Sequence, residues 1–163
     1  SKSYAMTGWR IGYVAAPANI SKLIGNYLSH CISSPCSISQ KAAAAALSGS
    51  QETVEAMRKA FEERRNYMVD RMNQIEGVSC IQPHGAFYVM MNIEKLVGKE
   101  LFGHVIQDSD DFGKLFLQYG KVAVVPGTSF GAPNFVRWSY ATSIENIKEG
   151  LDRLEKFLRG EAV

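Results

Sequence analysis

Apolar and polar residues in the first third of the chain predict one strand followed by two helices. The run from Trp9 to Ala16 is apolar and β-prone, which predicts a buried strand. Asn19 favours the start of a helix that runs to about Cys31, because its side chain can accept a hydrogen bond from an otherwise unpaired backbone N–H group. Ser34-Pro35 favours the start of a second helix, with proline at the first helical position.

The longest helical pattern lies in the middle of the chain. From Ser50 to Glu76 the apolar residues recur mainly at intervals of three, four and seven, which is the period of one helical face. This pattern predicts a single long helix between two glycines, because Gly49 ends the preceding helix and Gly77 ends this one. A helix of that length is long enough to link two lobes.

After Gly77 the pattern changes to short strands and short helices. Strands are predicted over residues 78–82, 87–93, 122–125 and 135–140. Ser109 favours the start of a helix that ends at Gly120, and the segment from Thr142 to Glu145 predicts a capping box before the last helix. The segment 95–108 is the most loop-like part. Together these elements predict a compact two-layer α/β lobe.

Composition and charge exclude several classes of function. The chain has 163 residues, of which 46% are apolar and 21% charged, the balance of a soluble globular domain. A net charge of +2 is too small to indicate a nucleic-acid or membrane partner, so neither is expected. The odd number of cysteines and the lack of an apolar signal segment favour a reducing, cytoplasmic setting. Cys31 and Cys36 are not followed by histidine at zinc-finger spacing, so no metal site is expected.

Lys2 and Arg10 are the first candidates for chemistry. A lysine amine can condense with an aldehyde to give a Schiff base. The planar guanidinium of an arginine suits bidentate binding of a phosphate. Pyridoxal phosphate carries both an aldehyde and a phosphate. The alternatives are a solvated lysine near a chain end and a surface arginine in a salt bridge.

Arg137 is the third candidate, because it interrupts the apolar strand predicted over residues 135–140. An unpaired charge there carries a desolvation penalty unless an anion meets it. One candidate for that anion is an Asp or Glu carboxylate of the protein, in an internal salt bridge.

Several motifs of the chain resemble one protein family. The run from Ser1 to Gly12 resembles the Schiff-base lysine signature of the class I and II aminotransferases, which are fold type I pyridoxal-phosphate enzymes. The matching positions are Ser1, Lys2, Ala5, Met6, Gly8, Arg10, Ile11 and Gly12. The sequence AMTGWRIGY is most similar to the prokaryotic aspartate aminotransferase-like branch. The segments PHGAFYVMMNI, VAVVPGTSFG and FVRWSYATS follow in the family's order.

The resemblance implies a role for each candidate residue. Lys2 holds the pyridoxal phosphate as a Schiff base and moves a proton on the substrate. Arg10 binds the cofactor's phosphate, and Arg137 binds the α-carboxylate of the substrate. The substrates are an amino acid and a 2-oxo acid, which exchange an amino group by a ping-pong mechanism. The segment from Gly85 to Tyr88 either closes over the substrate or is a simple turn.

The resemblance also implies a domain organisation and an assembly. The fold is the C-terminal portion of the fold type I transferase fold, an α/β fold. Residues 1–49 are a remnant of the large cofactor-binding domain with its last strand and helices, 50–77 are the long linking helix, and 78–163 are the small C-terminal domain. The complete enzyme is expected to be a homodimer.

A chain that starts one residue before its reactive lysine is expected to be a C-terminal fragment. The other cofactor-binding residues of the resembled family precede that lysine, so the isolated chain is expected to be inactive. Two alternatives stay open. One is a pyridoxal-phosphate-dependent lyase or synthase on the same scaffold, and the other is a non-enzymatic interaction lobe.

Overall fold

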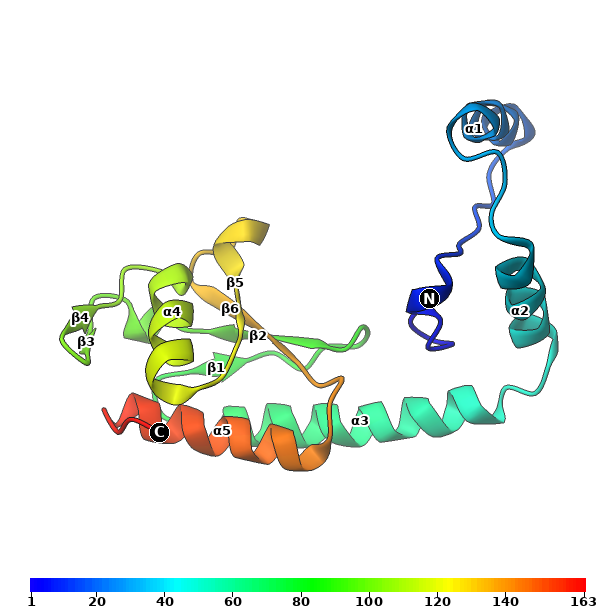
Figure 1. Ribbon diagram of the computed structural model, residues 1–163. Helices are drawn as coiled ribbons and strands as arrows, with labels where there is room; N and C mark the ends of the chain where they lie inside the picture. Colours follow the sequence, from blue (N-terminus) through cyan, green and yellow to red (C-terminus); the bar gives the residue numbers. More distant parts are fainter. The chain divides into compact units, whose positions relative to one another are not determined.

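The structure is a computed structural model that describes all residues from 1 to 163. The chain divides into two compact units, residues 1–58 and 59–163. Helix α3 (Glu52–Met72) contains the point of division (Figure 1). No helix is long and apolar enough to cross a lipid bilayer.

The first unit is helical and contains no strand. A turn at the N-terminus leads into the short 3₁₀ helix η1 (Thr7–Trp9), which is followed by α1 (Ala18–Cys31) and α2 (Ser37–Ser48). The predicted strand from Trp9 to Ala16 is therefore wrong, since residues 10–16 form neither a helix nor a strand. A strand needs a neighbour for its backbone hydrogen bonds, and no strand of the chain pairs with this segment.

The starts of both helices differ from the prediction, while their ends agree with it. The residue before α1 is Pro17 rather than Asn19, and the residue before α2 is Cys36 rather than Ser34. Neither of these residues makes a capping side-chain hydrogen bond, so cap chemistry did not set the starts. Helix α1 ends at Cys31 and α2 is followed by Gly49, both as predicted.

Helix α3 has 21 residues and ends earlier than the pattern predicted. After Met72 the backbone tightens into i→i−3 hydrogen bonds, and the Asn73 side chain turns to bond the backbone of Cys80, accepting from its N–H at 2.8 Å and donating to its carbonyl at 3.1 Å. These contacts take the place of the hydrogen bonds that would continue the α-helix beyond Met72. Gly77 lies in the turn that follows, where a φ of 93° favours glycine.

The second unit contains a four-stranded sheet in which all neighbours are antiparallel. The strands are β1 (Ser79–Cys80), β2 (Tyr88–Asn92), β6 (Phe135–Ser139) and β5 (Val125–Pro126), in that spatial order. The strand predicted over 122–125 is corrected, because only Val125 and Pro126 pair with β6. The segment predicted as a loop, 95–108, contains the end of the 3₁₀ helix η2 (Glu94–Leu96) and a small hairpin of β3 (Glu100–Leu101) and β4 (His104–Val105).

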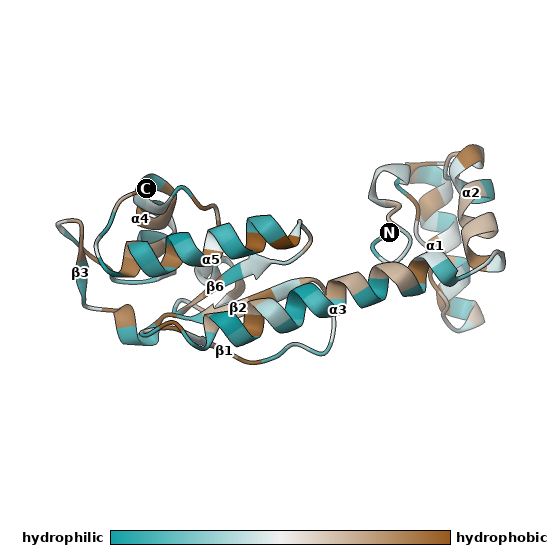
Figure 2. Cartoon of the chain, turned by 90° about the horizontal axis from the view of Figure 1, so that it is seen from below, coloured by the Kyte–Doolittle hydropathy of each residue, from teal (hydrophilic) through white to brown (hydrophobic).

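The sheet buries one face and leaves the other more open. Val89, Met91, Val136 and Trp138 are buried, and they alternate along β2 and β6 with less buried residues. Helices α4 (Ser109–Gly120) and α5 (Ile144–Leu158) pack on the buried face: the Phe116 and Trp138 ring centroids are 5.7 Å apart, and Gly150 of α5 lies against the Trp138 ring. Figure 2 shows hydrophobic and hydrophilic residues interspersed along α3 and α5, as expected for helices with one face in the core.

The caps of α4 and α5 correct three predictions. The residue before α4 is Asp108 rather than Ser109. The Asp108 carboxylate accepts hydrogen bonds from the backbone N–H groups of Asp110 and Asp111. The residue after α4 in the left-handed conformation is Lys121, while Gly120 still belongs to the helix. Helix α5 is capped by the Ser143 hydroxyl, which accepts from Asn146 N–H at 3.2 Å, in place of the predicted Thr142. The α/β class predicted for the chain is confirmed.

Candidate functional site

Lys2 lies on an exposed turn at the start of the first unit. The turn is closed by two backbone hydrogen bonds, from Met6 N–H to the Ser1 carbonyl at 2.7 Å and from Ala5 N–H to the Lys2 carbonyl at 3.0 Å. The Lys2 side chain makes no hydrogen bond or ion pair with the rest of the chain. No other group of the chain therefore occupies its amine.

Arg10 directly follows η1 in the left-handed conformation, with a φ of 51°. Its guanidinium donates one hydrogen bond, from Nη1 to the Thr7 carbonyl at 3.0 Å. Because this is its single hydrogen bond, the other N–H groups of the Arg10 guanidinium are free to bind an anion. The Ser1 hydroxyl, which donates to the Ile11 carbonyl at 3.4 Å, ties the start of the chain to this same segment.

An open groove of about 610 Å³ lies beside this segment within the first unit. Its walls come from the N-terminal turn and from α2, and include Ser1, Tyr4, Ile11, Gln40 and Ala43. Neither Lys2 nor Arg10 lines it.

Arg137 belongs to the second unit and lies on the more open face of the sheet. In the β2–β6 ladder it is paired with Met90, and in the β5–β6 ladder with Val125. Its guanidinium forms no ion pair. Instead its Cζ atom lies over two aromatic rings, at 4.3 Å from the centroid of Tyr88 and 4.6 Å from the centroid of Phe130. No carboxylate of the 163 residues forms the internal salt bridge that the sequence left open as an alternative.

Within the segment from Gly85 to Tyr88, residues 85–87 form the loop that enters β2 and Tyr88 is the first residue of the strand. Ala86 has a φ of 61°, a left-handed conformation that is unfavourable for a residue with a side chain. The loop is held by Tyr140, whose hydroxyl donates to the Ala86 carbonyl at 2.9 Å and whose N–H donates to the Phe87 carbonyl at 3.0 Å. The backbone here is fixed by contacts with β6 and its continuation.

The structure groups the candidate residues by unit. Lys2 and Arg10 lie in the first unit within one short segment, and Arg137 lies in the second. Sequence reasoning named Tyr88 only as part of the segment from Gly85 to Tyr88, and it linked neither Tyr88 nor Phe130 to Arg137. Phe130 had a detectable signal, because an aromatic residue in the otherwise small and polar run from Gly127 to Gly131 is unusual for a turn.

Three comparisons with known proteins agree with one another. The family model for "Aminotransferase class I and II" matches residues 1–154. An aspartate aminotransferase from Geobacillus stearothermophilus is 46% identical over 162 residues, which is 99% of this chain and 40% of that protein. An aspartate/prephenate aminotransferase from Cereibacter sphaeroides is 45% identical over 162 residues, which is 98% of this chain and 40% of that protein.

Solved structures show the same fold. The crystal structure of the aspartate aminotransferase from Rhizobium meliloti superposes with a TM-score of 0.93 at 40% identity, covering 97% of this chain and 40% of that one. An aromatic aminotransferase from Pyrococcus horikoshii OT3 gives a TM-score of 0.87 at 37% identity, covering 98% of this chain and 41% of that one. The chain thus spans about 40% of the length of the curated relatives it matches.

Proposed function

The chain belongs to the class I and II aminotransferases, and we propose that it supplies part of the active site of an enzyme that moves an amino group between an amino acid and a 2-oxo acid. The observation that carries the proposal is the family match over residues 1–154, a range that includes Lys2, Arg10 and Arg137. Because the chain spans about 40% of its relatives, the activity is proposed for the whole protein, and the 163 residues alone are expected to be inactive.

The family implies pyridoxal phosphate as the cofactor, and the donor set of the first unit fits it. Lys2 offers an amine without a competing partner, which suits an aldehyde. Arg10 offers a guanidinium with a single hydrogen bond to a backbone carbonyl, which suits a phosphate. When bound, this cofactor acts as an electron sink for the substrate carbon that loses its proton.

Each residue then has a proposed task. The Lys2 amine would hold the cofactor through its aldehyde carbon, and it would accept and return the substrate proton. Arg10 binds the phosphate and thereby fixes the cofactor's position. Arg137 binds the α-carboxylate that every amino-acid and 2-oxo-acid substrate carries, and so orients the substrate.

The substrate side chain and the assembly are finer points of the same proposal. Relatives named aspartate aminotransferase support aspartate as one substrate. A homodimer and a cytoplasmic setting are also proposed. The three free thiols support a reducing compartment, while the homodimer rests on the family resemblance alone.

A complementation experiment tests the proposal. The chain is mixed with the part of the Geobacillus stearothermophilus relative that the match leaves out, in the presence of pyridoxal phosphate, and transfer from aspartate to 2-oxoglutarate is measured. We expect transfer in the mixture and none with the chain alone. Lys2→Ala is expected to lower the rate at least about 100-fold, because it removes the group that moves the proton.

Lys22→Ala is the matched control, since Lys22 is an exposed lysine on α1 of the same unit. It is expected to leave the transfer rate unchanged. A mixture that shows the visible absorbance of bound cofactor but no transfer, or equal rates for Lys2→Ala and Lys22→Ala, would contradict the proposal and favour a non-enzymatic lobe.

A further inference from the structure

The environment of Arg137 differs from that of most other arginines in its unit, although Arg64 also lies over a ring, with its Cζ atom 5.5 Å from the Phe61 centroid. Arg71, Arg153 and Arg159 each form an ion pair with a glutamate. Arg137 is partly buried and has no carboxylate partner, but its guanidinium lies over two aromatic rings. A ring face attracts a cation through its quadrupole without using any of the cation's N–H donors. The arginine is held in place while its full hydrogen-bonding capacity is kept.

The two rings reach Arg137 from different elements. Tyr88 lies on β2, two residues before the position that pairs with Arg137, so the two side chains are diagonal neighbours on one face of the sheet. Phe130 is the last residue of the 3₁₀ helix η3 (Gly127–Phe130), which joins β5 to the segment that leads into β6. Phe130 is 53% exposed and is not part of the hydrophobic core.

The turn that carries Phe130 is fixed by close contacts. A Cβ atom on Gly127 would lie 2.2 Å from the Ala132 carbonyl oxygen and 2.4 Å from the Phe135 carbonyl oxygen, so the backbone is packed too tightly there for any side chain. The next residue, Thr128, donates its N–H to the hydroxyl of buried Ser109 at the start of α4, at 3.2 Å. These contacts therefore fix the position of the backbone that carries Phe130.

We propose that Tyr88 and Phe130 are positioning residues that hold the Arg137 guanidinium in the orientation required by a substrate carboxylate. A carboxylate neighbour would neutralise the arginine and compete with the substrate for the same N–H groups, whereas the rings do neither. Fixing the guanidinium plane before the carboxylate arrives lowers the entropy cost of forming a bidentate pair. This inference rests on the proposed function, because it assumes that Arg137 binds the substrate carboxylate.

The test uses side-chain nuclear magnetic resonance of the ¹⁵N-labelled chain. Arg137→Lys identifies the arginine Nε–Hε signal of Arg137, and the chain is then titrated with acetate as the smallest carboxylate probe. Tyr88→Leu and Phe130→Leu each remove one ring. We expect each of them to shift the Arg137 signal as its ring current is lost, and to raise the Kd for acetate about 3-fold, or about 10-fold in the double variant.

Tyr88→Phe and Phe130→Tyr are the conservative controls, since each keeps a ring and alters only the hydroxyl. They are expected to keep both the signal position and the acetate affinity. The backbone amide spectrum of β6, recorded on the same samples, reports whether the sheet is intact, so a variant that unfolds is recognised and replaced by Tyr88→Met or Phe130→Met.

The outcomes separate the inference from the proposed function. If acetate leaves the Arg137 signal of the unsubstituted chain unmoved, the inference is overturned, while the proposed function is decided separately by the complementation experiment. If acetate binds but the leucine variants bind it equally well, or the conservative variants lose as much affinity as the leucine variants, only the positioning role of the rings is overturned.

Discussion

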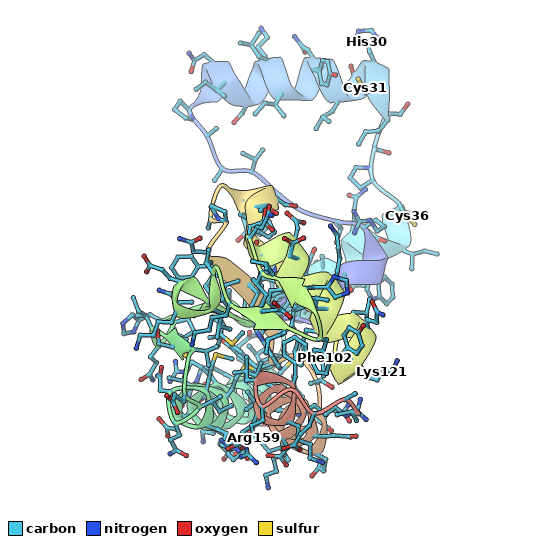
Figure 3. The ribbon with its side chains drawn as sticks, turned by 90° about the vertical axis from the view of Figure 1, so that its left-hand side faces the viewer. His30, Cys31, Cys36, Phe102, Lys121 and Arg159 are labelled. Atoms are coloured by element: carbon cyan, nitrogen blue, oxygen red, sulfur yellow. The ribbon has the colours of Figure 1, made fainter.

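Cys80 and Cys36 differ in what surrounds their thiols. Cys80 is half-buried at the start of the sheet, and burial raises the pKa of its thiol to about 11, an effect that a hydrogen bond from Asn73 only partly opposes. Cys36 is exposed just before α2 (Figure 3). The backbone amide groups of Ser39 and then Ile38 lower the pKa of the Cys36 thiol, although no capping hydrogen bond forms.

The two thiols should therefore react at different rates. The thiolate is the nucleophile, and at pH 8 a thiol with a pKa of about 11 is ionised roughly 100-fold less than one with the ordinary value of 9.0. We expect iodoacetamide to alkylate Cys36 at least about 100-fold faster than Cys80 in the folded chain. Peptide mass spectrometry over time measures both rates in one sample. Equal rates in the folded chain would contradict the prediction, while urea should remove the difference.

At the scale of single elements, the ion pair between α3 and α5 depends on pH. Arg71 of α3 bonds Glu155 of α5 and lies 3.4 Å from Asp152, and Arg159 bonds the other oxygen of Glu155 at 2.6 Å. The hydrogen bond from Arg71, followed by the one from Arg159, lowers the pKa of the Glu155 carboxyl. The pKa of the Arg71 guanidinium is raised, chiefly by the same bond with Glu155.

The sign of the effect on stability follows from the direction of the Glu155 shift. A carboxyl with a lowered pKa in the folded state stabilises that state above its ordinary pKa, and the contribution is lost as the pH falls through the folded value. We expect Glu155→Gln to lower the free energy of unfolding at pH 7, and the gap from the unsubstituted chain to close below about pH 4. Urea unfolding, followed by circular dichroism at each pH, measures the free energy of unfolding of both chains.

Glu161→Gln is the control for this pair, because Glu161 is exposed after the end of α5 and makes no ion pair. It is expected to leave the unfolding free energy unchanged at both pH values. A pH-independent gap between the unsubstituted chain and Glu155→Gln would show that the side chain acts by packing alone.

The sequence predicted well those elements whose secondary structure is determined by the pattern of their own residues. Strands β2 and β6 alternate buried and open positions, and the apolar stripe of α5 includes buried Ile147 and Leu151, so pattern and structure agree. The failed strand over 9–16 shows the limit of pattern reasoning, because a strand exists only where another strand accepts its hydrogen bonds. Local competition explains the caps: Asp108 and Ser109 are both good capping residues, and Ser109 is instead engaged with Thr128.

At the scale of the whole molecule, the charged residues of the candidate site could be predicted from the sequence, but the aromatic rings that contact Arg137 could not. Lys2, Arg10 and Arg137 stand in motifs that resemble one family, and their roles stay predictions. The rings of Tyr88 and Phe130 come together through the β2–β6 register and the anchoring of η3, which are properties of the fold. No local pattern links residues 88 and 130, because they are distant in the sequence.

The two units differ in how much apolar surface they bury. All buried hydrophobic residues lie between Met68 and Phe157, in the second unit. Helix α1 has no buried residue, and its Leu23 and Tyr27 are 68% and 70% exposed. A 14-residue helix without tertiary packing is marginal in water. The first unit of this chain should therefore open far more readily than the second.

Hydrogen exchange with mass spectrometry should show this difference directly. Amide protection follows the free energy of local opening, which is low where few apolar contacts hold an element. At pH 7 we expect peptides from α1 to exchange within seconds, and those from β6 and α4 to exchange at least about 1,000-fold more slowly. Each sample carries its own control, because both units belong to one chain. Equal protection of α1 and α4 would contradict the assignment of stability to the second unit, since α1 would then need a source of packing that its own exposed residues do not provide.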